Sequence, residues 1–188
     1  MTQPRSVAVI VGSLRKDSVS RKLAHALEKL TPNLTFSEVE IGGLQLFNQD
    51  LEATPTAEWV AFRAKIAAAD AVLFVTPEYN RSVPGALKNA IDVGSRPYGS
   101  SVWNGKPGAV ISVSPGGVGG FGANHHLRQS LVFLNVPVLS SEAYVGNAFS
   151  LFNEAGELAN DGTAAFLTTY GKAFTGWIET ILAGKTAA

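Results

Sequence analysis

Three hydroxyls and one guanidinium gather in residues 12–20, directly after a short apolar run. Ser13, Ser18 and Ser20 offer hydrogen-bond donors, and Arg15 adds a positive charge. The segment matches neither G-x-G-x-x-G nor G-x-x-x-x-G-K-[ST], so it predicts neither a pyrophosphate loop nor a P-loop. Free amide groups at a helix start favour an anion, and several donors with one Arg suit a terminal phosphate monoester. An alternative stays open, in which Ser18 only caps the helix and Arg15 is solvated.

Two further segments have the composition of ligand-binding loops. In residues 76–85 two prolines stiffen the chain, Tyr79 offers a flat face, and the peptide groups of residues 78–80 can meet the edge of a planar ring. In residues 114–122, five of the chain's 19 glycines leave bare backbone that a ligand can approach closely. Taken singly, the first is compatible with a rigid loop carrying an incidental tyrosine, and the second with a featureless connection.

Short apolar runs alternate with amphipathic stripes along the chain. The runs predict strands at 7–11, 36–41, 71–75, 109–113 and 136–139. The stripes predict helices around 23–30, 59–66, 87–91, 127–134 and 166–181, the last an aromatic stripe that we assign to the core. A helix after each strand predicts a three-layer, doubly wound α/β sheet. Ligands of such sheets bind beyond the carboxyl ends of the strands, where all three loops are expected.

Composition limits the classes of function. The chain has 188 residues, 15 basic and 15 acidic side chains, 46% apolar residues and no cysteine. We therefore expect a single domain spanning residues 1–188. Zero net charge argues against a nucleic-acid partner, and the lack of cysteine excludes disulfides, thiol nucleophiles and Cys-bound metals. The first apolar run is too short for a signal peptide or a membrane span, so we expect a cytoplasmic protein that makes no membrane contact.

The three histidines give no sign of a metal site. His125 and His126 are adjacent, so on a helix they diverge, and no HExxH motif accompanies them. We expect a surface or oligomer-contact role for them and an exposed position for His25. No G-x-S-x-G nucleophile elbow is present, which argues against an α/β-hydrolase.

Together these segments resemble the NAD(P)H-dependent FMN reductase family, in particular its chromate/quinone reductase branch. The matching motifs are GSLRKDSVSRKLA (12–24), TPEYNRSVPGALKNAID (76–92), SRP (95–97), GKP (105–107) and HLRQSLVFL (126–134). The resemblance implies a flavodoxin-like fold with five parallel strands in the order 2-1-3-4-5. It also implies FMN as cofactor, NADH or NADPH as electron donor, and a homodimer or homotetramer. The acceptors that it implies are quinones, chromate, ferric complexes, azo compounds or free flavin.

The resemblance also implies which residues bind the cofactor. The phosphate cradle corresponds to Ser13, Arg15, Ser18 and Ser20, the loop at the isoalloxazine edge to Pro77, Glu78, Tyr79 and Asn80, and the loop beneath the pyrimidine end to Ser114 and Gly117. Arg96 is a candidate for binding the anionic donor or acceptor; alternatively, it is a surface Arg that packs its stem. Val93 and Gly94 stand where family members often carry a Trp, so the sequence departs from the family pattern at the acceptor pocket.

The implied mechanism assigns no catalytic side chain, because flavin N5 is the reactive centre. NAD(P)H would deliver a hydride, leave, and be replaced by the acceptor, which predicts ping-pong kinetics. One alternative is a flavodoxin-type electron carrier, although such carriers are typically acidic and this chain is neutral. A second is a flavin-free dinucleotide-binding protein, with Glu40 on the ribose, which the missing glycine fingerprint disfavours.

Overall fold

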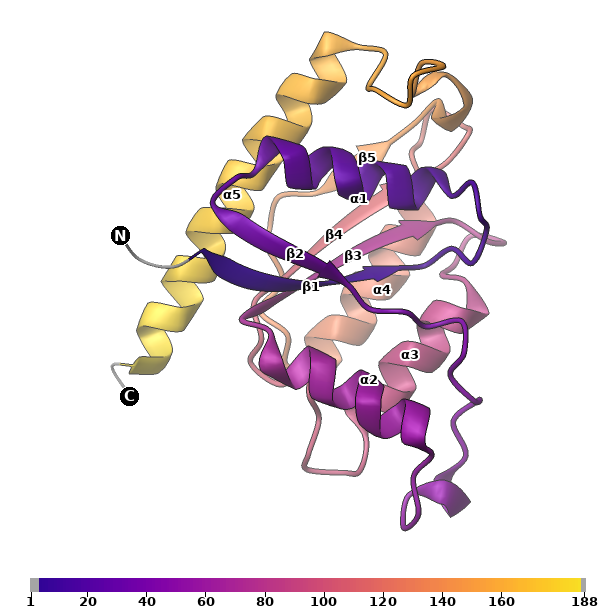
Figure 1. Ribbon diagram of the computed structural model, residues 1–188, viewed down its shortest axis with the longest axis vertical. Coiled ribbons are helices and arrows are strands. Elements are labelled where there is room, and N and C mark those ends of the chain that lie inside the picture. The colour runs from indigo at the N-terminus through magenta and orange to yellow at the C-terminus, as the bar shows by residue number, and fades with distance from the viewer. Residues whose placement is uncertain (1–3, 187–188) are drawn as a thin grey trace.

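The computed structural model describes residues 4–186 and consists of a parallel sheet between two layers of helices (Figure 1). The strands are β1 (Arg5–Val11), β2 (Leu34–Glu38), β3 (Ala71–Pro77), β4 (Gly108–Val113) and β5 (Ala143–Val145). The helices are α1 (Val19–Leu30), α2 (Ala57–Ala68), α3 (Gly85–Ser95), α4 (Phe121–Phe133) and α5 (Asp161–Thr186), with short 3-10 turns η1 (Gln49–Leu51) and η2 (Ala148–Ser150). The strand order β2-β1-β3-β4-β5, with every pair parallel, confirms the predicted flavodoxin-like sheet.

The central strands are apolar on both faces because helices cover both sides of the sheet. Every residue of β4 is buried, as are all but the last of β3. Helices α1 and α5 cover one face, where Leu27, Tyr170 and Phe174 pack against β1, β3 and β4. Helices α2, α3 and α4 cover the other, where Trp103 and Phe74 are fully buried. The predicted core role of the aromatic stripe in α5 is confirmed at Tyr170 and Phe174, whereas Phe166 is 39% exposed.

The predicted fifth strand at 136–139 is wrong. Val138 makes only an isolated bridge to Gly108, and the ladder resumes at Ala143, which lies opposite Ile111 of β4. The edge strand is therefore interrupted, and Arg128 of α4 donates to the carbonyls of Leu139 and Ser141 at the break, each over 2.8 Å. Apolar periodicity marks the first half of this edge but cannot reveal a guanidinium from another element that satisfies the interrupted backbone.

Local capping signals set where the helices begin. Ser18 caps α1 by accepting the Arg21 amide over 3.2 Å, and Thr56 caps α2 by accepting the Trp59 amide over 3.3 Å. Pro84 directly precedes α3, as its fixed φ favours. Within residues 4–186, no helix combines the length and apolarity needed to cross a membrane.

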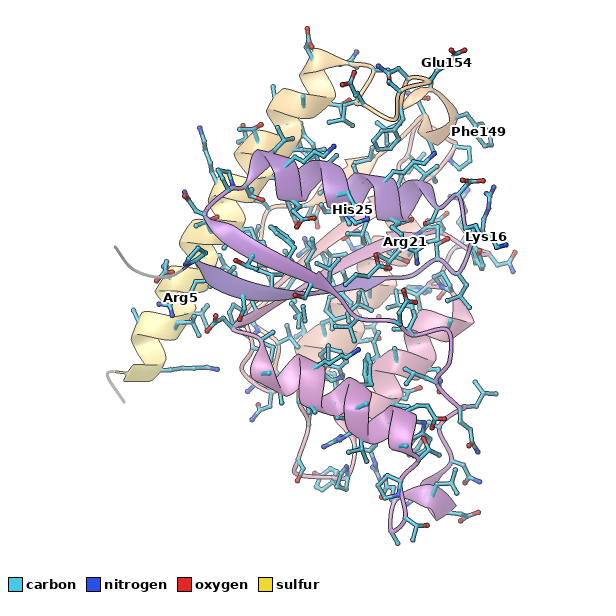
Figure 2. All side chains as sticks on the ribbon, viewed as in Figure 1. Arg5, Lys16, Arg21, His25, Phe149 and Glu154 are labelled. Carbon is cyan, nitrogen blue, oxygen red and sulfur yellow. The ribbon has the colours of Figure 1, made fainter. Side chains whose placement is uncertain are left out.

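The loops that follow β1, β3 and β4 leave the sheet at the same end, because the carboxyl ends of parallel strands lie together. Lys16, after β1, and Phe149, after β5, lie toward this end of the molecule, whereas Arg5 at the start of β1 lies at the opposite end (Figure 2). There Arg5 pairs with Glu179 of α5 over 2.8 Å. Fold and sequence therefore bring the three unusual loops together.

Candidate functional site

A cleft of about 260 Å³ lies where the loops after β1, β3 and β4 meet. The predicted residues that line it are Ser13, Arg15, Ser20, Pro77, Glu78, Tyr79 and Ser114, and they are joined by Val19, Val113, Pro115, Ala148 and Phe149. Seven predicted binding residues from three separate loops thus face one hollow. Ligands of doubly wound sheets occupy this location.

One end of the cleft lies at the start of α1. Ser13 is 5% exposed and Ser20 is 2% exposed, so their hydroxyls sit low in the cleft wall beside the first amides of the helix. The Arg15 side chain is exposed, and no side chain within residues 4–186 pairs with its guanidinium. Donors, a helix N-terminus and a free cation favour an anionic group here. We call this region the anion end.

Arg21 braces the backbone of the anion end. Its Nε donates to the Glu38 carboxylate over 2.8 Å, and its Nη1 donates to the carbonyl of Arg15 over 3.1 Å. Gly12 allows the loop to leave β1 close to β3, because a Cβ at Gly12 would lie 2.8 Å from the Thr76 hydroxyl. The loop is thus fixed at its backbone while the Arg15 side chain remains free to meet a ligand.

The other end of the cleft is formed by a tight hairpin after β3. The amides and carbonyls of Tyr79 and Ser82 exchange two hydrogen bonds of 2.9 Å, and the φ angles of Asn80 and Arg81 are +51° and +62°. Positive φ at both central residues is the pattern of a type I′ turn. Tyr79, half exposed, presents its side chain beside Pro77 and Ser114. We call this region the planar end.

The Glu78 carboxylate is held by α4 as well as lining the cleft. Its Oε2 accepts the Ala123 amide over 3.1 Å, and its Oε1 accepts from the Arg81 guanidinium over 3.3 Å. The side chain is only 12% exposed. The Glu78 side chain therefore connects two loops. The groups of this loop that remain available to a ligand are its backbone and Tyr79.

A buried polar network supports the glycine-rich loop. The Ser112 hydroxyl donates to the Gly119 carbonyl over 2.7 Å, and Asn124 Nδ2 donates to Ser112 Oγ over 3.1 Å and to the Ala143 carbonyl over 3.2 Å. Arg128 Nε donates to Asn124 Oδ1 over 2.8 Å. Ser112 and Asn124 are fully buried. The sequence analysis missed this network, because the spacing of these residues in the sequence does not distinguish them from ordinary strand and helix positions.

Ala148 and Phe149 are cleft residues that the sequence analysis also missed. They belong to η2, which follows β5, and Phe149 is 86% exposed at the cleft rim. The signal was available, since residues just after each strand are the ones expected at a ligand. A fifth strand at 136–139 would place residues 140–142 at the carboxyl end of the sheet, whereas β5 ends at Val145 and places residues 146–150 there.

Four predicted residues do not line the cleft. Ser18 is 2% exposed and caps α1, Asn80 lies at the tip of the hairpin, and Gly117 is an exposed residue of the glycine-rich loop. Arg96 lies elsewhere, beside α2, where its Nε pairs with Glu52 and its guanidinium stands 5.8 Å from the centre of the Phe47 ring. The Glu52 carboxylate raises the pKa of Arg96 by hydrogen bonding.

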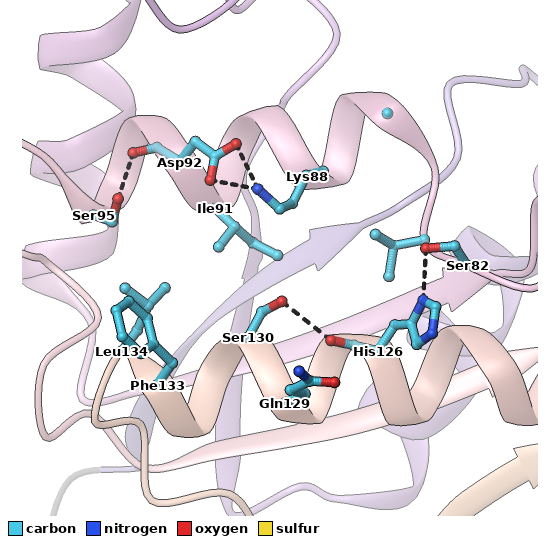
Figure 3. Close-up of a pocket in the computed structure, with 12 residues that line it drawn as sticks. Ser82, Lys88, Ile91, Asp92, Ser95, His126, Gln129, Ser130, Phe133 and Leu134 are labelled. Atoms are coloured by element: carbon cyan, nitrogen blue, oxygen red, sulfur yellow. Dashed lines mark hydrogen bonds and ion pairs between the residues drawn. The ribbon is translucent and has the colours of Figure 1, made fainter. Parts of the chain in front are cut away.

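A larger hollow of about 780 Å³ lies outside the cleft, between α3 and α4 (Figure 3). Ile91 of α3 points into it toward α4, and Phe133 lies at its far end. Lys88 and Asp92 pair along α3 over 2.8 Å. Within residues 4–186, no group of three or more His, Asp or Glu side chains is arranged to hold a metal ion.

The family model described as NADPH-dependent FMN reductase matches residues 5–150 of this chain. A quinone reductase of Pseudomonas putida is 60% identical over 182 residues, which cover 95% of this chain and 97% of the relative. A 2-hydroxy-1,4-benzoquinone reductase of a Burkholderia species is 44% identical over 175 residues, which cover 92% of this chain and 96% of the relative.

Among solved structures, this fold is similar to FerB, a flavoenzyme NAD(P)H:(acceptor) oxidoreductase from Paracoccus denitrificans. The two share a TM-score of 0.88 and 43% sequence identity, over 94% of this chain and 98% of that one.

Proposed function

The chain belongs to the NADPH-dependent FMN reductase family and is an FMN-containing, NAD(P)H-dependent quinone reductase, and we propose that the cleft after β1, β3 and β4 binds its FMN. The observation that carries this proposal is the meeting of Ser13, Arg15 and Ser20 with Tyr79 and Ser114 around one hollow. These residues come from three loops that are far apart in the sequence, yet they supply an anion site and a flat wall to the same cavity.

The anion end suits the phosphate of FMN. A phosphate monoester needs several donors at once, and the Ser13 and Ser20 hydroxyls, the first amides of α1 and the Arg15 guanidinium supply them. Ser18 contributes by capping the helix whose amides face the site. The residues present therefore fit the charged end of the cofactor.

The planar end suits the flavin ring. Pro77 and Tyr79 form a flat wall, and the peptide groups of residues 78–80 with Ser114 offer hydrogen bonds to a ring edge. When bound, FMN supplies a ring that accepts a hydride from NAD(P)H and returns two electrons to the acceptor. The chain orients that ring and excludes water from one of its sides, and we assign no catalytic side chain.

We expect the donor and the acceptor to use the same open side of the cleft in turn. The hollow, at about 260 Å³, is smaller than the ~300–1,000 Å³ of typical cofactor pockets, so a bound cofactor would stand partly outside it. A ring exposed in this way is compatible with ping-pong kinetics, in which donor and acceptor reach it in turn. We propose quinones as the acceptors, and chromate, ferric complexes, azo compounds and free flavin as further ones. Arg96 lies beside α2 and does not line the cleft, so we propose it only as a contact for a part of the donor or acceptor that extends beyond the cleft.

The test is a visible absorption spectrum of the purified protein, followed by anaerobic titration with NADH and NADPH and then with a benzoquinone. We expect flavin absorbance that bleaches with the donor and returns with the quinone. Initial rates, measured at several concentrations of donor and quinone, should give parallel lines in double-reciprocal plots. A protein that keeps its colour in excess donor would instead be a flavodoxin-type carrier. A colourless protein that does not take up FMN would contradict the cofactor assignment.

We further propose that the enzyme is a single-domain, cytoplasmic homodimer or homotetramer. The support for the assembly lies in the hollow between α3 and α4, where Phe133 of α4 is 88% exposed and is joined by Val83, Ile91 and Leu134. Large apolar side chains gathered on one face favour contact with another protein surface. Light scattering of the parent protein and of Phe133→Glu tests the assembly, since a monomeric parent, or a variant with unchanged mass, would contradict this role for the face.

A further inference from the structure

Helix α4 begins without a capping side chain from its own segment. Its N-cap position is Gly120, which has a φ of +78° and no side chain to accept the free amides of the first turn. The Glu78 carboxylate, from the loop after β3, takes this place by accepting the Ala123 amide over 3.1 Å. A carboxylate at a helix N-terminus is favoured both by the hydrogen bond and by the helix dipole. The cap thus joins two loops of the cleft.

The same helix holds the hairpin at a second point. His126, one turn further along α4, is hydrogen-bonded through Nδ1 to the Ser82 hydroxyl over 2.9 Å, as the dashed line in Figure 3 shows. Glu78 and Ser82 flank Tyr79 on either side in the chain. The hairpin is therefore fixed to α4 before and after the residue that faces the cleft.

The backbones at this junction are in close contact. A Cβ at Gly122 would lie 2.7 Å from the Arg81 carbonyl and 3.0 Å from Glu78 Oε2. Asn80 and Arg81 also keep positive φ angles, which cost side-chain-bearing residues energy unless the surroundings impose them. The turn of the hairpin and the first turn of α4 thus pack directly against each other.

We propose that Glu78 is a positioning residue, which caps α4 from the loop after β3 and thereby fixes the Tyr79–Ser82 hairpin against the start of that helix, beside the glycine-rich loop. The proposal rests on the proposed FMN site, because it assigns the junction the task of setting the shape of the planar end. The Glu78 side chain itself does not react. It connects the loops after β3 and β4, so that the ring contacts of both are held in one arrangement.

The experiment compares Glu78→Ala, Glu78→Gln and Arg81→Ala with the parent. In Glu78→Ala we expect FMN to bind about tenfold more weakly, as loss of one charge-assisted hydrogen bond predicts. Glu78→Gln keeps an oxygen that can accept the Ala123 amide, so we expect less than about a threefold change. Arg81→Ala removes the exposed partner of Glu78 Oε1 and leaves the bond from the Ala123 amide to Oε2 in place. It therefore serves as the matched control, with less than about a twofold change.

Two readouts separate positioning from general stability. Amide exchange of Ala123, measured by NMR in the FMN-free protein, should accelerate at least about tenfold in Glu78→Ala and much less in Glu78→Gln. Visible circular dichroism of the bound flavin, measured at saturating FMN, should change in Glu78→Ala, whereas a merely structural role would lower the melting temperature and leave that spectrum unaltered.

The outcomes distinguish this inference from the proposed function. If the parent does not bind FMN, the proposed function fails, and the exchange of the Ala123 amide still tests the cap. If the parent binds FMN while Glu78→Ala matches it in affinity, amide exchange and flavin spectrum, the positioning role is overturned. Should Glu78→Ala not fold, Glu78→Gln decides: rescue of the parental spectrum supports the role, and a spectrum unlike the parent's in a folded Gln variant contradicts it.

Discussion

The anion end and the planar end of the cleft are built in different ways. At the anion end, Ser13, Arg15 and Ser20 come from one continuous segment, and the guanidinium of Arg15 is exposed and unpaired within residues 4–186. At the planar end, the contacts come from separate loops, held together by Glu78 and by the buried network of Ser112 and Asn124. The anion end is thus built from residues close together in the sequence, whereas the planar end depends on tertiary contacts between separate loops.

This difference follows from what each end must recognise. A phosphate accepts hydrogen bonds from many directions, so donors near one helix start suffice and a flexible Arg can adjust. A rigid planar ring requires several backbone segments at fixed distances from its edge and face, and only tertiary contacts hold separate loops in that way. We therefore expect mutations at the planar end to alter stability and binding together, and mutations at the anion end to alter binding alone.

The largest effect is expected at the planar end, in Asn124→Ala. The change removes the amide nitrogen that donates to Ser112 Oγ and to the Ala143 carbonyl, and the amide oxygen that accepts from Arg128 Nε. Because these hydrogen bonds are buried, we expect the free energy of unfolding to fall by about 2–4 kcal/mol. Urea denaturation measures this, with the exposed Asn33→Ala as the control, expected to change by less than about 0.5 kcal/mol. Equal losses in the two variants would mean that the network is not structural.

Arg15→Ala should show the opposite pattern at the anion end. Loss of one charge-assisted contact of about 1.5–3 kcal/mol weakens FMN binding by roughly 10- to 150-fold. The melting temperature of the FMN-free variant should match the parent, because the side chain is exposed. Flavin fluorescence titration tests this against Lys16→Ala, an exposed neighbour. Parental affinity in Arg15→Ala would remove it from the phosphate site.

A smaller effect is expected from the flat wall of the planar end. Tyr79→Ala removes a half-exposed aromatic face, which should weaken FMN binding by about 5- to 10-fold, as an aromatic contact of about 1 kcal/mol predicts. Tyr79→Phe keeps the face and should stay near the parent. If the two variants were equally impaired, the hydroxyl and not the ring would be the recognised group.

The smallest effect on the cleft is expected from Asp70, at the far end of the sheet. Burial raises the pKa of this carboxyl, but hydrogen bonds from the Ser6 amide and hydroxyl and the charges of Arg5 and Lys106 outweigh it, so the pKa lies below its ordinary value. Stability from Asp70 is then present above the unfolded pKa of ~3.9 and is lost as the pH falls through the folded pKa.

For Asp70→Asn we therefore expect a loss of less than about 1 kcal/mol at neutral pH, which shrinks below about pH 4, with unchanged FMN affinity. Urea unfolding at pH 7 and pH 3 measures the first expectation and fluorescence titration the second. A change in FMN affinity would show that the two ends of the sheet are coupled, which would undermine the comparison.

Sequence predicted the parts of the molecule whose signals are local. The buried runs of β1, β3 and β4 and the three loops were predicted, because each carries its pattern within about ten residues; for Ser18, the structure shows the helix cap that the sequence left open as an alternative. What was missed depends on distant partners. Arg128 donates to the carbonyls at the break in the edge strand, and Glu78 accepts an amide 45 positions away in α4. Phe149 lies at the cleft because it follows β5, whose position the sequence did not predict.

The interrupted edge strand has a consequence for the behaviour of the protein in concentrated solution. A long, flat edge offers a row of free amides and carbonyls to another chain and invites edge-to-edge aggregation. Here β5 contains only Ala143–Val145, and the carbonyls of Leu139 and Ser141 before it already accept from Arg128. Little of this edge remains to template an intermolecular sheet. The same guanidinium that supports the glycine-rich loop thus also limits strand pairing between molecules at this edge of the sheet.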